Sequence, residues 1–322
     1  MPQHDSHQWV DSFPWSLAYR WGHSALTADF DLSGDAPGLL RVRRPDEPEP
    51  GPEEGATGTG TALPLVRLTL LGDDTEAGGR LRYRAHHSTY GGTAPGTAPG
   101  IASDCAAGPD WHRLTFELHD PTTGLTAFAE YASPDGVPVL RSRVRLRHDG
   151  TGTLTVGAVA SLLLGGLPSS DELLVLHAHN DRLGESRWHT EPLRNSVPGT
   201  GHAAARRAGR GGLRTDGPLA TGALRHRRDG RAWLWRIESA AGWAWEAGES
   251  AGRTYLALGG PTHDEHRWCQ VLAPGAEFTT EWAVLALGTR FDDALSALAA
   301  CRRALRDPRD RADALTGEPV TD

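Results

Sequence analysis

Tryptophans at alternate positions are the feature that most restricts the fold of this chain. Trp233 and Trp235 are separated by one residue, and so are Trp243 and Trp245. Side chains two residues apart lie on the same face of a β-strand, so each pair predicts a strand that buries one face against a second sheet. We expect these indole rings to pack in the core, although stacking on sugar rings is an alternative. The chain is therefore expected to be mostly β.

Strand-like segments recur along the rest of the chain. They lie at residues 15–21, 65–71, 81–84, 114–118 and 125–131, with turn signals such as Asp120-Pro121 and Asp135-Gly136 between them. Many strands without intervening helices favour two stacked antiparallel sheets, which we place in one domain over residues 1–290. Segments 43–62, 90–109 and 195–217 are rich in Gly, Pro, Ala or charged residues, and we expect them to be mobile surface loops.

One amphipathic helix is predicted near the C-terminus, over residues 291–306. Large apolar side chains recur there at three- and four-residue steps, acidic residues begin the segment and arginines end it. Pro308 ends the helix, and residues 307–322 are expected to form a frayed tail. The apolar stripe consists of Phe291, Leu295, Leu298, Cys301 and Leu305.

Composition excludes several classes of function. The net charge is −8, all basic side chains other than histidine are arginines, and no basic tail is present, so we expect no nucleic-acid partner. Cys105, Cys269 and Cys301 fit neither a disulfide framework nor a zinc site, and we expect reduced thiols. The first eight residues do not form a secretory signal, and the longest apolar run, 154–167, is too short to cross a membrane. We therefore expect a cytoplasmic protein with no membrane partner.

Three polar groups are candidate sites. Arg141, Arg143, Arg145 and Arg147 alternate along one strand, which could hold an acidic ligand but favours a solvated or interface face neutralised by carboxylates such as Glu117 or Glu130. His177, His179 and Asp181 have a spacing that a metal permits, yet no further ligand is signalled, so we predict no metal and no cofactor. The segment 263–266 is expected to be a polar turn rather than an acid–base site.

Four blocks in order resemble a known family. They are segments 133–144, 185–193, 233–262 and 272–280, within a region of roughly 110–306. They are similar to the N-terminal domain of bacterial family-36 glycoside hydrolases, the α-galactosidases. The resemblance implies an all-β fold, a large two-sheet antiparallel β-supersandwich with a C-terminal helix. In that family the helix leads into a (β/α)8 barrel that carries both catalytic carboxylates, one of them in a Lys-x-Asp motif. This chain contains no lysine, so we expect it to lack the barrel and to contain no catalytic residue.

The resemblance also implies a role. We expect a non-catalytic domain that supports barrel packing, oligomer assembly and the shape of the galactoside pocket, with a barrel domain, further copies of the chain and α-galactosides as partners. Candidate substrate contacts are Asp181, Arg187 and Trp188. A free-standing carbohydrate-binding or assembly module is the first alternative, and it predicts a shallow cleft with an exposed tryptophan, whereas the barrel-associated domain predicts an apolar docking patch. A mutarotase-like enzyme with a His acid and a Glu base is the second alternative.

Overall fold

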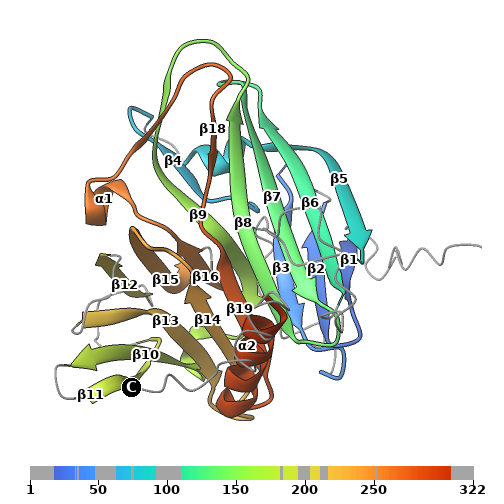
Figure 1. Ribbon diagram of the computed structural model, residues 1–322, viewed down its shortest axis with the longest axis vertical. Coiled ribbons are helices and arrows are strands. Elements are labelled where there is room, and N and C mark those ends of the chain that lie inside the picture. Colours follow the sequence, from blue (N-terminus) through green and yellow to red (C-terminus); the bar gives the residue numbers. More distant parts are fainter. Residues whose placement is uncertain are drawn as a thin grey trace, which may run out of the picture.

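The structure is a computed structural model that describes residues 18–32, 34, 36–47, 63–73, 76–91, 110–181, 184–194, 204–210, 217–250 and 252–305. Antiparallel strands make up most of this part of the chain and form two stacked layers, with one long helix, α2 (Phe291–Leu305), against the outside (Figure 1). The predicted all-β sandwich with a C-terminal helix is therefore confirmed.

One layer is a single large sheet that runs the length of the molecule. Its strands follow the order β11 (Gly184–Pro192), β10 (Leu173–Asp181), β13 (Gly217–His226), β14 (Ala232–Ile237), β19 (Ala283–Gly288), β8 (Val139–His148), β7 (Leu125–Pro134), β6 (Trp111–Asp120) and β5 (Arg82–Tyr90), and β18 (Glu277–Thr279) also pairs with β8. All its pairings are antiparallel.

Hydrogen bonding divides the second layer into two sheets. A six-stranded sheet contains β12 (Ala204–Arg210), β15 (Gly242–Ser250), β16 (Arg253–Gly259), β9 (Leu154–Leu167), β17 (Gln270–Leu272) and β4 (Leu68–Leu70), and a three-stranded sheet contains β1 (Ala18–His23), β2 (Leu26–Asp31) and β3 (Gly38–Arg43). The two sheets touch where β3 passes β9: a Cβ at Gly166 would lie 1.9 Å from the Leu40 carbonyl oxygen. The longest apolar run of the sequence is thus a strand, β9. Short helices lie at Ala77–Arg80 (η1), Ser170–Glu172 (η2) and His263–His266 (α1), so the predicted polar turn at 263–266 is one helical turn.

Alternate tryptophans join the large sheet to the six-stranded sheet. Trp233, Trp235, Trp243 and Trp245 are all buried, which confirms their prediction as core residues. Trp235 of β14 and Trp245 of β15 meet edge to face, with ring centroids 5.1 Å apart. Gly222 lies opposite Trp235 on the neighbouring strand, and a Cβ there would lie 2.6 Å from the indole ring. The glycine therefore makes room for the ring that links the two layers.

The sequence predicts a loop over 195–217, and this prediction is wrong for part of the segment. It contains β12, which pairs with β15 over seven residues. The Ala, Arg and Gly residues of β12 show no apolar alternation, and the large apolar side chains come from its partner strand, β15. Gly209 lies opposite Trp243, and a Cβ added at Gly209 would lie 2.5 Å from the indole ring. The other two predicted loops begin at the ends of strands, Arg43 of β3 and Tyr90 of β5, and most of each lies outside the described residues.

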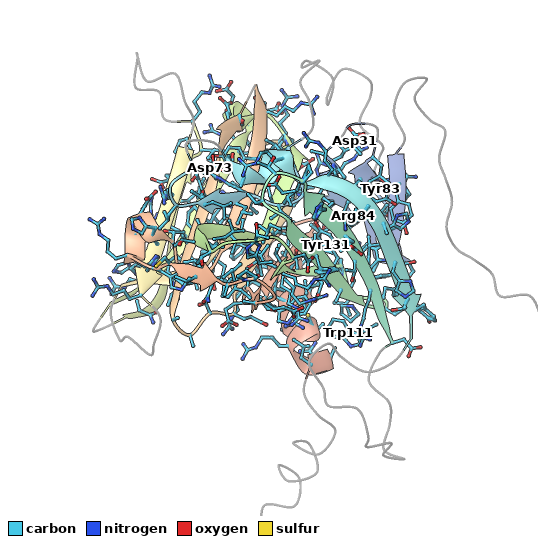
Figure 2. All side chains as sticks on the ribbon, turned by 90° about the horizontal axis from the view of Figure 1, so that it is seen from above. Asp31, Asp73, Tyr83, Arg84, Trp111 and Tyr131 are labelled. Atoms are coloured by element: carbon cyan, nitrogen blue, oxygen red, sulfur yellow. The ribbon has the colours of Figure 1, made fainter. Side chains whose placement is uncertain are left out.

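Helix α2 packs on the outer face of the large sheet, but its buried stripe is rotated from the one that the sequence predicts. Ala294, Ala297, Leu298 and Cys301 are buried, whereas Leu295 is 38% exposed. At about 100° per residue, Leu295 lies nearly a third of a turn from the centre of the buried face, because small side chains let the helix approach the sheet on the alanine side. Trp111, from the start of β6, lies beside the helix in the same cluster (Figure 2).

The two described cysteines, Cys269 and Cys301, are free thiols, as predicted, and Cys105 lies outside the described residues. Burial raises the pKa of Cys301 to about 12. No described helix has the length and apolar character needed to cross a membrane.

The β6–β7 turn begins at a buried carboxylate, Asp120. Its oxygens accept hydrogen bonds from the Thr122 amide at 2.9 Å, the Thr123 hydroxyl at 2.9 Å and Arg80 Nε at 3.1 Å. Burial alone would raise the pKa of Asp120, but these three donors outweigh it and hold the pKa below its ordinary value. Ionised Asp120 therefore stabilises the folded state.

We expect Asp120→Asn to lower the free energy of unfolding by about 1–2 kcal/mol at pH 7, because the carboxylate accepts charge-assisted hydrogen bonds that an amide replaces poorly. The folded-state pKa lies below the unfolded value of about 3.9, so the difference from wild type should be full above that pH and should shrink as the pH falls further. Urea unfolding at pH 7 and at acidic pH measures it. Asp46→Asn, at an exposed ion pair with Arg44, is the control and should change stability by less than about 0.5 kcal/mol. Equal free energies of unfolding for the wild type and Asp120→Asn at pH 7 would contradict this account.

Candidate functional site

The three predicted substrate contacts lie on the edge hairpin of the large sheet, β10–β11. Arg187 is exposed and lies opposite His179. Trp188 points to the other face, where its ring meets Phe291 of α2 edge to face at 5.0 Å. The backbone of Asp181 pairs with Gly184, and its side chain lies outside the described residues. The structure thus places Arg187 and Trp188 on opposite faces of one strand, so they do not form one contact surface, and their role stays a prediction.

The histidines on the same hairpin, His177 and His189, lie beside the Arg207–Glu191 ion pair. His177 stacks on His189 across the strands, with ring centroids 5.4 Å apart, and its Nε2 lies 3.7 Å from Glu191. Arg207 of β12 lies 3.3 Å from the same nitrogen and forms a 2.8 Å ion pair with Glu191. Burial and this guanidinium lower the pKa of His177. A cation against the imidazole nitrogen disfavours a metal there.

The arginine stripe of β8 is neutralised on its outer face, as we had favoured. Arg143 and Arg145 share Glu130, at 2.7 and 3.5 Å, whereas Glu117 lies nearest Arg84 instead, at 3.9 Å. The remaining carboxylates are Glu238 on Arg141 at 2.6 Å, Glu277 on Arg145 at 3.3 Å and Asp149 on Arg147 at 2.7 Å. Trp282 and Phe128 lie under the guanidinium groups, at 3.9–5.2 Å. These arginines are therefore already paired, which disfavours an acidic ligand.

Exposed aromatic and apolar side chains bear on the two non-catalytic hypotheses. None of the nine tryptophans in the described part of the chain is exposed, so the open stacking platform of a carbohydrate-binding module is not found there. Leu71 and Val271 are exposed, and their backbones lie on the two sides of Thr155 of β9. Tyr83 and Tyr90 of β5 and Leu295 of α2 are the other exposed large apolar side chains in this part.

Two histidines and an aspartate meet at one end of the sandwich, where the three-stranded sheet packs on the large sheet. His23 ends β1, His112 lies near the start of β6, and Asp135 lies in the turn between β7 and β8. One ring nitrogen of each histidine and a carboxylate oxygen lie within 4.8 Å of one another. We call these residues the histidine cluster. Among the described residues no other group of His, Cys, Asp and Glu ligand atoms is this closely gathered.

The two rings of the histidine cluster stack, with centroids 4.7 Å apart and planes at 29°. Oδ1 of Asp135 lies 3.2 Å from Nε2 of His112 and 3.8 Å from Nδ1 of His23. Tyr90 covers the other side of His112, at a centroid distance of 4.5 Å. Backbone pairing brings the turn here, because the Asp135 amide donates to the Asp110 carbonyl at 2.8 Å and Gly136 takes a φ of +71°. The cluster is therefore held by three separate elements.

His23 is the buried member of the cluster. Its side chain is 2% exposed, compared with 13% for His112 and 43% for Asp135. Burial, together with the neighbouring His112, lowers the pKa of His23 to about 4 although Asp135 opposes the shift. Sequence reasoning missed this cluster because its members are far apart in the chain and have no motif spacing. The Asp135-Gly136 turn signal was the only local indication.

No protein-family model matches this sequence, and no curated protein sequence matches it. Solved structures share its fold. An α-galactosidase from Lactobacillus brevis is 14% identical with a TM-score of 0.67, and the match covers 92% of this chain and 42% of that one. The galactosidase domain of the α-galactosidase–sucrose kinase AgaSK is 16% identical with a TM-score of 0.66, covering 87% and 41%.

A third match is a variant of the family-36 α-galactosidase AgaA from Geobacillus stearothermophilus in complex with raffinose, at 16% identity and a TM-score of 0.63, covering 84% of this chain and 40% of that one. The predicted resemblance to a domain of the family-36 α-galactosidases is thus confirmed at the level of fold. The chain spans about two fifths of the length of the solved structures that it matches.

Proposed function

We propose that this chain is the non-catalytic β-supersandwich domain of an α-galactosidase-like glycoside hydrolase. The observation that carries the proposal is the coverage of the fold match: 84–92% of this chain corresponds to 40–42% of each enzyme. In this proposal residues 1–290 form the sandwich domain, and α2 leads toward a barrel. The domain supports barrel packing, oligomer assembly and the shape of the galactoside pocket.

The chemistry of the described carboxylates supports a non-catalytic role. Retaining glycoside hydrolysis needs two carboxyl groups about 5–5.5 Å apart that are free to act as acid and nucleophile. On the outer face of the large sheet, Glu130, Glu238 and Asp149 are each bound to arginine. Because they are bound in this way, these carboxylates neutralise arginines of the sheet and are not free to act on a substrate.

Candidate contacts follow from the same proposal. The AgaA variant is in complex with raffinose, and we propose α-galactosides as the ligands of the complete enzyme to which this domain belongs. On the β10–β11 hairpin, exposed Arg187 is positioned to reach a ligand or a neighbouring domain, whereas Trp188 anchors the hairpin to Phe291. We propose the exposed side chains of Leu71 and Val271 as apolar contacts for a docked domain.

We expect the purified chain to fold and to release no p-nitrophenol from p-nitrophenyl α-galactoside above the blank. Folding is expected because the alternating strands and the helix agree with one large core. Inactivity is expected because hydrolysis depends on positioned acid and nucleophile carboxylates. The spectrophotometric assay, run beside an intact family-36 enzyme as positive control, tests both points. Turnover that disappears on replacing one acidic residue of this chain would overturn the proposal.

A sugar titration separates the domain from a free-standing carbohydrate module. Raffinose up to millimolar concentration should leave the intrinsic tryptophan fluorescence unchanged, since the nine described tryptophans are all at least partly buried. Saturable quenching that Arg187→Ala abolishes would favour the binding module instead.

A further inference from the structure

We propose that the histidine cluster is a binding site for one divalent transition-metal ion, Zn²⁺ by preference, with His23 Nδ1, His112 Nε2 and a carboxylate oxygen of Asp135 as ligands. Bonds of about 2.0–2.1 Å in a tetrahedral zinc site place the ligand atoms about 3.3 Å apart. Oδ1 of Asp135 lies 3.2 Å from one nitrogen and 3.8 Å from the other. The third pair of ligand atoms, one ring nitrogen from each histidine, lies within 4.8 Å. The stacked rings therefore turn so that both nitrogens point at the ion, and water takes the fourth position.

Hydrogen bonds set His23 in the tautomer that a metal requires. The Ser133 hydroxyl donates to the Val139 carbonyl at 2.6 Å, so its oxygen accepts from Nε2–H of His23, also at 2.6 Å. The Ala25 amide donates to Nδ1 at 3.3 Å, which requires a lone pair there. A metal ligand is commonly oriented by a partner on its other ring nitrogen. Nδ1, which faces Asp135, is thus unprotonated, and the long Ala25 contact is the one that the ion replaces.

The charge around the cluster favours a cation. Asp135 supplies a negative charge, and its carboxylate accepts the Nε2–H of His112 at 3.2 Å, so binding of the ion moves that proton from Nε2. At the stacked pair of His177 and His189, by contrast, the cation Arg207 lies 3.3 Å from Nε2 of His177. Two ligands come from facing sheets and one from a turn, so the bound ion would cross-link β1 to the large sheet.

Calorimetric titration of the chelator-treated full chain with ZnCl₂ at pH 7.5 tests the proposal. We expect one ion per chain. Asp135→Asn and His112→Ala should each weaken binding at least about tenfold, and Ser133→Ala, which frees the tautomer, by about tenfold. His189→Ala is the matched control, since it removes an exposed histidine from the other pair, and should leave the affinity unchanged. Asp135→Asn is the main variant because that side chain is 43% exposed, so the change should leave the fold intact.

Thermal unfolding gives a second measurement that needs no enzymatic activity. Zn²⁺ should raise the Tm of the wild type and of His189→Ala, but not that of Asp135→Asn, because binding to the folded state alone stabilises it. Binding no tighter than about 100 µM, unchanged affinity in Asp135→Asn, or loss of binding in His189→Ala would each overturn the proposal. None of these outcomes depends on the proposed role in an α-galactosidase.

Discussion

Trp235→Ala is expected to lower the free energy of unfolding by about 3 kcal/mol, the largest loss among the substitutions considered for this fold. Replacing a buried Trp with Ala typically costs about 3–5 kcal/mol through lost transfer energy and the remaining cavity. Trp235 is 0% exposed and forms the edge-to-face contact with Trp245 that joins the two layers. Its indole nitrogen has no acceptor among the described residues, so the substitution also removes an unsatisfied donor. Removal of the unsatisfied donor offsets part of the lost packing, so the expected loss in the free energy of unfolding lies at the lower end of that range.

Urea unfolding followed by circular dichroism measures this loss. Trp235→Phe should fall between wild type and Trp235→Ala, because a phenyl ring fills part of the cavity beside Gly222. Tyr83→Ala, at a side chain that is 38% exposed on β5, is the control and should cost less than about 1 kcal/mol. A Trp235→Ala protein within about 1 kcal/mol of the wild type would show that the tryptophan contact does not hold the layers together.

The sequence predicts the strands that bury large side chains at alternate positions. Trp233 and Trp235 lie on β14, and Trp243 and Trp245 on β15, with their rings between the layers. Period-two burial is a local property, so it can be predicted without knowledge of the partner strand. The predicted helix begins at Phe291, as the structure has it, because its acidic first turn and apolar steps are also local.

Features that depend on partners distant in the sequence could not be predicted in this way. Strand β12 has no apolar alternation, and its pairing with the tryptophan strand β15 supplies the burial that its own residues lack. The histidine cluster joins residues from β1, β6 and a turn, whose proximity follows from sheet packing rather than from spacing. The split of the second layer into two sheets likewise depends on how β3 meets β9.

The rotated stripe of α2 predicts that two leucines of the same helix differ in how much they stabilise the fold. Leu298→Ala should lower the free energy of unfolding by about 2–3 kcal/mol, since Leu298 is 9% exposed against the large sheet and buried Leu→Ala changes cost about 2–5 kcal/mol. Leu295→Ala is the matched control: it makes the same chemical change three residues earlier, at a side chain that is 38% exposed. It should cost less than about 1 kcal/mol, because little apolar area returns to water and helix propensity favours alanine.

Chemical denaturation of the two leucine variants, monitored by near- and far-ultraviolet circular dichroism, distinguishes the two stripes. The sequence-based stripe, which includes Leu295, predicts similar losses for both variants. The structure predicts a difference of at least about 1 kcal/mol, because Ala294 and Ala297 bring the helix close to β19 on the side away from Leu295: a Cβ at Gly288 would lie 2.4 Å from the Ala294 nitrogen. Equal losses would mean that the helix rotates about its axis in solution and that the alanine face does not fix its position on the sheet.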